Sequence, residues 1–207
     1  MINPMTNQPV PQPPNIDRLL DLQKFLLQFQ SIDRVIHLKH KDDYPNENDV
    51  EHSYSLAMLA WFLAGHFPEL DKDKVIRYAL VHDLVEVYAG DTYIFADSAH
   101  LNSKHQREKD ALERINAEWA DFPDMTNDIT EYETRNSPEA KFIYALDKIA
   151  PIMINIINKG YTWHQEKISL DQLHSNKANK VLTSPEIKPY YDQLYAIMQA
   201  NPQFFSE

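Results

Sequence analysis

The chain has 207 residues, of which 43% are hydrophobic and 25% charged, ordinary values for a globular protein with a sizeable core. It contains no cysteine, which excludes a disulfide scaffold and a thiolate metal site and is compatible with a cytoplasmic location. The formal net charge of −11 argues against a protein that coats a nucleic acid polymer, whereas a small anionic substrate remains open if a bound cation reverses the local field.

The first fifteen residues differ in composition from the rest of the chain. They hold five prolines and show no apolar periodicity, which predicts a disordered or extended tail over residues 1–15 and no signal peptide. Residues 16–207 are expected to form a single helical domain. No apolar stretch reaches the length that a membrane span requires.

Helical periodicity begins at Ile16, from which apolar residues recur at three- and four-residue steps as far as Phe29. A polar loop is expected over His37–Asp49. A second helix should follow over Val50–Phe67, and Pro68 should end it.

A third helix is expected after Asp71, whose side chain is a suitable N-cap. Gly90 should end this helix. A loop over residues 91–97 then leads to a long charged helix over residues 100–119, and a short helix is expected over residues 125–133.

Two Ser-Pro-Glu segments, at Ser137 and Ser184, each offer a hydroxyl cap, a proline at the first helical position and an acid near the positive end of the helix dipole. The first should begin a helix that ends at Gly160. No convincing period-two strand is present, so the fold class is predicted to be all-α, a compact bundle of about seven or eight helices. Four aromatic residues on these helices are expected in the core: Trp61, Phe62, Phe142 and Tyr144.

Four potential metal ligands stand on three of the expected helices. His52 lies early in the second, His82 and Asp83 are adjacent in the third, and Asp147 lies midway along the helix that follows Ser137. Imidazole and carboxylate groups are disfavoured in apolar stripes unless they are paired or metal-bound. Two imidazoles and two carboxylates can surround one divalent ion and leave positions open for water and substrate. This donor set suits manganese, cobalt, iron or zinc better than calcium, and magnesium also remains open.

Each of these residues also has a purely structural interpretation. A lone histidine on a helix is more often hydrogen-bonded than ligating, and the aspartates could cap loops or pair with Arg34, Arg77 or Lys148. The combination of an inward His-Asp pair with an upstream histidine and a downstream aspartate is what favours a metal site.

Two further acids follow the His-Asp pair. Glu86 lies three residues after Asp83 and four after His82, which places it on the same face of a helix. Asp91 follows Gly90, where the chain should leave that helix. A carboxylate beside a metal site can orient or deprotonate a water, and a second can protonate a leaving oxygen. The alternatives are a solvated helix residue for Glu86 and a turn residue for Asp91.

The order of these residues is similar to the signature of HD-domain phosphohydrolases. VHDLVEVYAGD, at residues 81–91, and EYETRNSPEAKFIYALDK, at residues 131–148, resemble segments of the YfbR-like 5′-deoxynucleotidases and their eukaryotic HD-domain-containing relatives. Ile32-Asp33-Arg34 resembles the short segment that carries a substrate-contacting arginine in that group. The resemblance spans roughly residues 20–160.

This resemblance implies that His52, His82, Asp83 and Asp147 bind one divalent metal ion. It further implies that Glu86 positions and activates the attacking water, that Asp91 acts near the sugar and the leaving oxygen, and that Arg34 contacts the phosphate. The implied protein is an all-α homodimer of the HD-domain fold that acts as a metal-dependent phosphomonoesterase on (deoxy)ribonucleoside monophosphates. Val35 stands where the bacterial deoxynucleotidase has a tryptophan that helps to select deoxyribose, so the sugar and base preferences stay open.

Three alternatives remain at this point. A dinuclear HD phosphodiesterase needs extra histidines, for which His100 and His105 on the charged helix are the candidates. An HD oxygenase is a second possibility. The third is a non-catalytic, metal-stabilised helical binding protein, against which Glu86 and Asp91 argue because a structural site needs neither.

Overall fold

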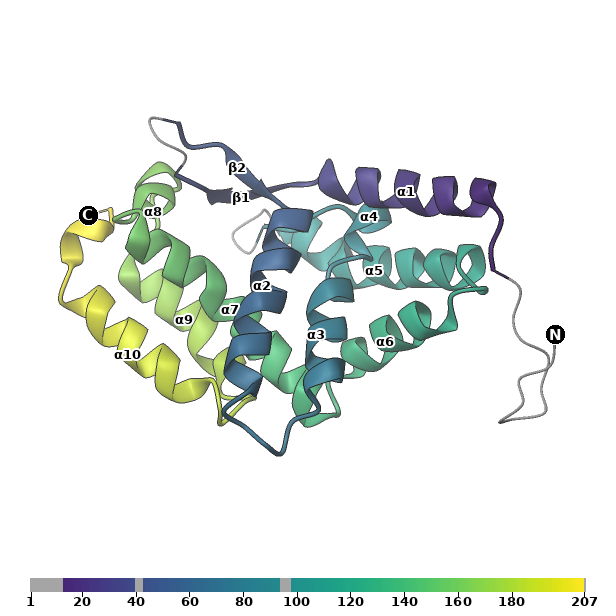
Figure 1. Ribbon diagram of the computed structural model, residues 1–207. Helices are drawn as coiled ribbons and strands as arrows, with labels where there is room; N and C mark the ends of the chain where they lie inside the picture. The colour runs from purple at the N-terminus through teal and green to yellow at the C-terminus, as the bar shows by residue number, and fades with distance from the viewer. Residues whose placement is uncertain (1–12, 40–42, 94–97, 207) are drawn as a thin grey trace.

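The computed structural model describes residues 13–39, 43–93 and 98–206, and these residues are mostly helical. Figure 1 shows α2 (Asp49–Ala64) and α3 (Lys72–Val81) packed side by side in the middle of the molecule. The helices α1, α5 and α6 lie toward one end, and α8, α9 and α10 lie toward the other (Figure 1). The predicted all-α fold class is confirmed.

The helices follow one another along the chain with short connections. None of those in the described residues is both long enough and apolar enough to cross a membrane. In addition to α2 and α3 they are α1 (Ile16–Gln30), α4 (Glu86–Ala89), α5 (Ser98–Glu118), α6 (Pro123–Thr134), α7 (Pro138–Ile157), α8 (Tyr161–Gln165), α9 (Leu170–Val181), α10 (Lys188–Gln199) and a short 3-10 helix, η1 (Pro202–Phe204).

Side-chain caps fix where several helices begin. Asn48 accepts a hydrogen bond from the Glu51 N–H at the start of α2, and the Glu51 carboxylate accepts one from the Asn48 N–H. Asp71 caps α3 and Ser137 caps α7, as the sequence predicts. Such a cap stabilises a helix by about 1 kcal/mol.

The third helix is shorter than predicted. It ends at Val81, residues 82–85 form a turn, and α4 carries the chain to Gly90, whose φ of 73° takes it out of the helix. Side chains of consecutive residues on a regular helix point about 100° apart. In the turn after Val81 the adjacent side chains of His82 and Asp83 nevertheless converge, with His82 Nε2 2.9 Å from Asp83 Oδ2.

A two-stranded antiparallel ribbon occupies part of the predicted polar loop. β1 (Asp33–His37) pairs with β2 (Asn46–Asn48), with Asp33 opposite Asn48 and His37 opposite Asn46. The register is irregular because β1 advances four residues while β2 advances two. These short strands are rich in polar residues and have no alternating apolar pattern, which is why the sequence analysis missed them.

The predicted cap at Ser184 is also wrong. α10 begins only at Lys188, and residues 185–187 form a turn. The Ser184 hydroxyl donates a 2.6 Å hydrogen bond to the Glu186 carboxylate instead of accepting one from a helical N–H.

The core lies on both sides of the central helix pair. One apolar cluster surrounds α7, where Phe142, Ile143 and Leu146 are fully buried as part of an unbroken apolar face. Asp147 follows directly on this face. Pro151, four residues further along α7, has no N–H to donate, so it leaves the main-chain carbonyl of Asp147 without its helical partner.

Candidate metal centre

The four predicted ligands meet between α2, α7 and the turn after α3. The Nε2 atom of His52 lies 3.0 Å from Asp147 Oδ1 and 3.9 Å from Asp83 Oδ2. The Nε2 atom of His82 lies 2.9 Å from Asp83 Oδ2 and 4.0 Å from Asp147 Oδ1. The structure thus brings together two imidazole nitrogens and two carboxylate oxygens from three segments of the chain.

Contacts behind the two rings orient them. His82 Nδ1 lies 2.9 Å from the Ala79 carbonyl and donates to it, which leaves Nε2 as the free nitrogen facing the carboxylates. His52 Nδ1 lies 3.4 Å from the buried Glu47 carboxylate. His82 Nε2 is buried and makes no hydrogen bond of suitable geometry to any residue that the structure describes, as expected of a nitrogen that is placed to bind a cation.

The two carboxylates at the centre are held in the ionised form. Burial disfavours the charge on Asp83, but His82 and Arg34 outweigh this effect and keep the pKa of Asp83 well below its usual range. Burial likewise disfavours the charge on Asp147, but Lys148 and His52 keep its pKa low. The Lys148 ammonium donates to Asp147 Oδ2.

His52 responds to the same negative charge. Burial and the Arg34 charge favour its neutral ring, but the hydrogen bonds to Asp147 and Glu47 prevail and raise the pKa of His52 to about 9. A proton on this ring and a metal ion at its Nε2 are alternative ways to balance the surrounding carboxylates.

Glu86 and Asp91 extend the acidic cluster. Burial raises the pKa of Glu86 well above its usual range, and the nearby charges of Asp83 and Asp91 raise it further. Glu86 Oε2 is buried and has no hydrogen-bond partner among the described residues. Carboxylate oxygens of Asp49, Asp83 and Glu86 lie within 4.8 Å of one another. This surplus of negative charge, together with the free imidazole nitrogen, fits a divalent cation.

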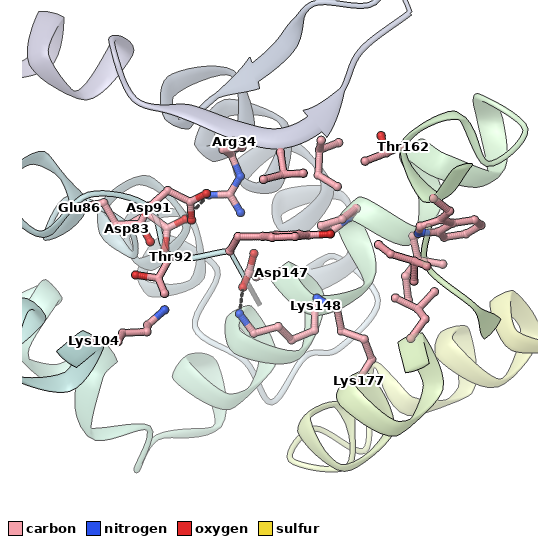
Figure 2. A pocket seen from close by; sticks show the side chains of 18 residues that line it. Arg34, Asp83, Glu86, Asp91, Thr92, Lys104, Asp147, Lys148, Thr162 and Lys177 are labelled. Atoms are coloured by element: carbon pink, nitrogen blue, oxygen red, sulfur yellow. Dashed lines mark hydrogen bonds and ion pairs between the residues drawn. The ribbon is translucent and has the colours of Figure 1, made fainter. Parts of the chain in front are cut away.

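Arg34 reaches this cluster from β1. Its Nη1 atom donates to Asp49 Oδ1 at 3.0 Å and to Asp83 Oδ2 at 2.8 Å, while Nε lies 3.6 Å from Glu47 Oε2. Figure 2 shows the guanidinium group pointing into the pocket beside Asp83 and Asp91. The carboxylates fix its position, and its planar donor fork suits a phosphate group.

A cavity begins at this centre and continues between α7, α8 and α9. Its charged end carries Arg34, Asp83, Glu86, Asp91 and Asp147. Figure 2 shows Lys148 and Lys177 on the opposite wall from Arg34, with Lys148 joined to Asp147. All the sequence-predicted site residues therefore lie in or beside one cavity.

The sequence analysis missed three charged residues around the cavity, Glu47, Asp49 and Lys177, and named Lys148 only as a possible ion-pair partner of the aspartates. A signal existed for one of them. Leu173, Lys177 and Val181 are four residues apart, so Lys177 occupies a position in an apolar stripe of α9. Nothing comparable marked Glu47, which lies in the polar ribbon strand.

The two additional histidines give no support to a second histidine-bound ion. His105 is exposed to solvent on α5. The side chain of His100 lies outside the part of the chain whose side chains the structure describes.

Comparison with known proteins gives a consistent picture. The HD domain family, HD_3, matches residues 28–188. The protein named 5′-deoxynucleotidase HDDC2 of Danio rerio is 33% identical over 140 residues, which cover 67% of this chain and 68% of that protein. The protein of the same name from Bos taurus is 31% identical over 159 residues, covering 75% and 74% of the two chains.

Solved structures of other proteins have a similar fold. A crystal structure from Magnetospirillum magnetotacticum, described as a predicted metal-dependent phosphohydrolase, superposes with a TM-score of 0.74 at 25% identity, covering 92% of this chain and 96% of that one. A conserved hypothetical protein from Pyrococcus furiosus, at 21% identity and a TM-score of 0.59, shares the fold.

Proposed function

Because the chain belongs to the HD domain family, we propose that it is a metal-dependent phosphomonoesterase that releases phosphate from (deoxy)ribonucleoside 5′-monophosphates. The observation that carries this proposal is the convergence of His52, His82, Asp83 and Asp147 at the charged end of one cavity. The names of the relatives point to the same class of reaction.

The four converging side chains would hold one divalent ion, with His52 and His82 binding through Nε2. Manganese, cobalt, iron, zinc and magnesium are all compatible with nitrogen and oxygen donors of this kind. When bound, the ion would polarise the phosphoryl group, lower the pKa of a nearby water and offset the charge that keeps a proton on Glu86.

The remaining side chains at the charged end have distinct roles in this proposal. Arg34, held by Asp49 and Asp83, binds the phosphate and neutralises the charge that develops on its oxygens. Glu86 Oε2, which has no hydrogen-bond partner in the part of the chain that the structure describes, accepts the proton of the attacking water. As the phosphorus–oxygen ester bond breaks, Asp91 delivers a proton to the leaving 5′ oxygen, a role that suits an acid whose pKa is raised by burial.

Phosphate release from a panel of ribo- and deoxyribonucleoside monophosphates tests this proposal, with manganese, cobalt, magnesium and zinc each added to the metal-free protein. We expect release with at least one metal and none with a chelator. A protein that binds metal tightly but hydrolyses no member of the panel would instead be a metal-stabilised binding protein. A clear preference for cyclic or diester substrates would favour the phosphodiesterase alternative.

We also propose that the protein is a homodimer that pairs through α2. This helix exposes Tyr54, Met58, Trp61 and Phe62, which lie on one face because they are spaced at helical intervals. Trp61 and Phe62 are 57% and 70% exposed, so the expectation that they belong to the core of the chain is wrong. A second copy would cover this apolar face without adding a new partner.

Replacing Trp61 by glutamate should therefore convert a dimer into a monomer at micromolar concentration, because the added charge would be buried at the interface. Light scattering after size-exclusion chromatography measures the mass directly. Ile157→Glu is the matched control, since Ile157 is another exposed apolar residue, at the end of α7 and away from the exposed face of α2. A monomeric wild type, or a dimer that survives Trp61→Glu, would contradict the proposed interface.

A further inference from the structure

The cavity has two chemically different ends. Its charged end holds the candidate metal centre and Arg34. Its other end, between α7, α8 and α9, is walled mainly by apolar side chains: Pro151, Ile152, Trp163, Ile168 and Leu173. Trp163 is fixed in this wall, because its ring stacks on Phe205 with 4.5 Å between the ring centroids. A ligand that fills both ends must combine an anionic group with a largely apolar body.

One charged side chain interrupts the apolar wall. Lys177 is only 5% exposed, at a stripe position between Leu173 and Val181 on α9, and Figure 2 shows it extending from that helix into the cavity. Its ammonium group makes no hydrogen bond or ion pair with the described residues. Burial and the neighbouring Lys148 charge lower the pKa of Lys177 to about 7. Placing an unpaired lysine here destabilises the folded protein.

The position of Lys177 indicates which kind of ligand group could accept a hydrogen bond from its ammonium group. Arg34, on β1, faces the proposed phosphate position from the opposite wall (Figure 2), whereas Lys177 lies on α9 one turn after the buried Leu173, which lines the far end of the cavity. A ligand group that binds at this end must offer Lys177 a hydrogen-bond acceptor, and the rest of that group must be flat and largely apolar. Carbonyl oxygens and ring nitrogens of a nucleobase have these properties, and an isolated phosphate does not.

We propose that the end of the cavity between α7, α8 and α9 is the nucleobase subsite, and that Lys177 is a specificity-determining residue that donates a hydrogen bond to the base. This inference rests on the proposed nucleotidase function and adds to it the part of the substrate that the far end recognises. Lys177 plays no part in the bond-breaking step.

The test compares Lys177→Met with Lys177→Gln, which keeps an N–H donor, and with Lys180→Met. Lys180 is the matched control because it lies on the same helix, is bonded to Asn176 and does not line the cavity. Lys177→Met should raise the KM for nucleoside monophosphates by about tenfold, the usual scale for losing a charged hydrogen bond, while kcat changes little. Lys177→Gln should recover part of the affinity, and Lys180→Met should behave as wild type.

Two binding measurements distinguish contact with the base from contact with the phosphate. Inhibition by inorganic phosphate should be unchanged in Lys177→Met; a parallel loss would show that Lys177 contacts the phosphate and would overturn the proposal. Nucleosides without phosphate should bind the metal-free wild type more tightly than the metal-free Lys177→Met protein, and equal binding would also overturn it. The nucleoside measurement decides this inference even if the wild type hydrolyses no nucleotide, an outcome that would count against the proposed function alone.

Thermal unfolding separates recognition from a structural role. If Lys177 serves ligand binding and its burial destabilises the fold, Lys177→Met should melt at the same temperature as the wild type or at a higher one. A clear fall in melting temperature, with unchanged KM values, would show that Lys177 serves the fold and would contradict the proposal.

Discussion

Asp83→Ala is expected to abolish turnover and to weaken metal binding strongly. Asp83 Oδ2 is the atom shared by the centre: it lies 2.9 Å from His82 Nε2, 3.9 Å from His52 Nε2 and 2.8 Å from Arg34 Nη1. Its removal takes away one proposed ligand and one of the carboxylates that hold Arg34. Losses of tenfold to a hundredfold are usual for residues that only support a ligand, so we expect a loss of metal affinity of about a hundredfold or more.

Elemental analysis and phosphate release on the same preparation measure both effects. Asp192→Ala is the control, because Asp192 is an exposed acid on α10 that pairs with Lys188. Circular dichroism establishes that each variant is folded. Stoichiometric metal in Asp83→Ala, at wild-type affinity, would remove Asp83 from the ligand set.

Glu86→Ala should separate catalysis from metal binding. Glu86 is not among the four converging ligands, yet its buried Oε2 atom lacks a hydrogen-bond partner among residues 13–39, 43–93 and 98–206, and its carboxylate lies close to Asp83. We expect nearly normal metal content and a fall in turnover of about a hundredfold or more, the usual contribution of a positioned acid–base group. Loss of metal would make Glu86 a ligand, and full activity would remove it from the mechanism.

Glu86→Gln provides a check that the side chain is placed as described. Because the folded protein raises the pKa of Glu86, the metal-free wild type loses stability as the pH rises above the ordinary range of a glutamate. The uncharged glutamine avoids this loss. At neutral pH the metal-free Glu86→Gln protein should therefore melt at a higher temperature than the metal-free wild type. With metal added, its turnover should be as low as that of Glu86→Ala.

The sequence predicted best those features that depend only on neighbouring residues, such as the ends of helices. The caps at Asp71 and Ser137 and the end of a helix at Gly90 depend on side-chain oxygens and on a positive φ, and all three were predictable. The four ligand candidates were recognisable because charged groups stand in apolar surroundings. These features need no knowledge of which segments pack together.

Tertiary packing determined what the sequence did not reveal. The turn after Val81 replaces a helix that the apolar pattern favoured, and it is stabilised by the contacts of His82 and Asp83 at the centre. The ribbon that carries Arg34 has no apolar alternation of its own. Trp61 and Phe62 could not be assigned to a surface, since an apolar face reads the same whether the chain's own core or a second copy covers it.

A crystal structure of the manganese-loaded protein, with the ion located by its anomalous scattering, tests the central claim most directly. We expect a single fully occupied ion bound by His52 Nε2, His82 Nε2, Asp83 and Asp147 at distances of about 2.0–2.3 Å. An ordered structure in which manganese binds elsewhere, or in which Asp147 keeps only its contact with Lys148 and leaves the ion, would contradict the proposed centre.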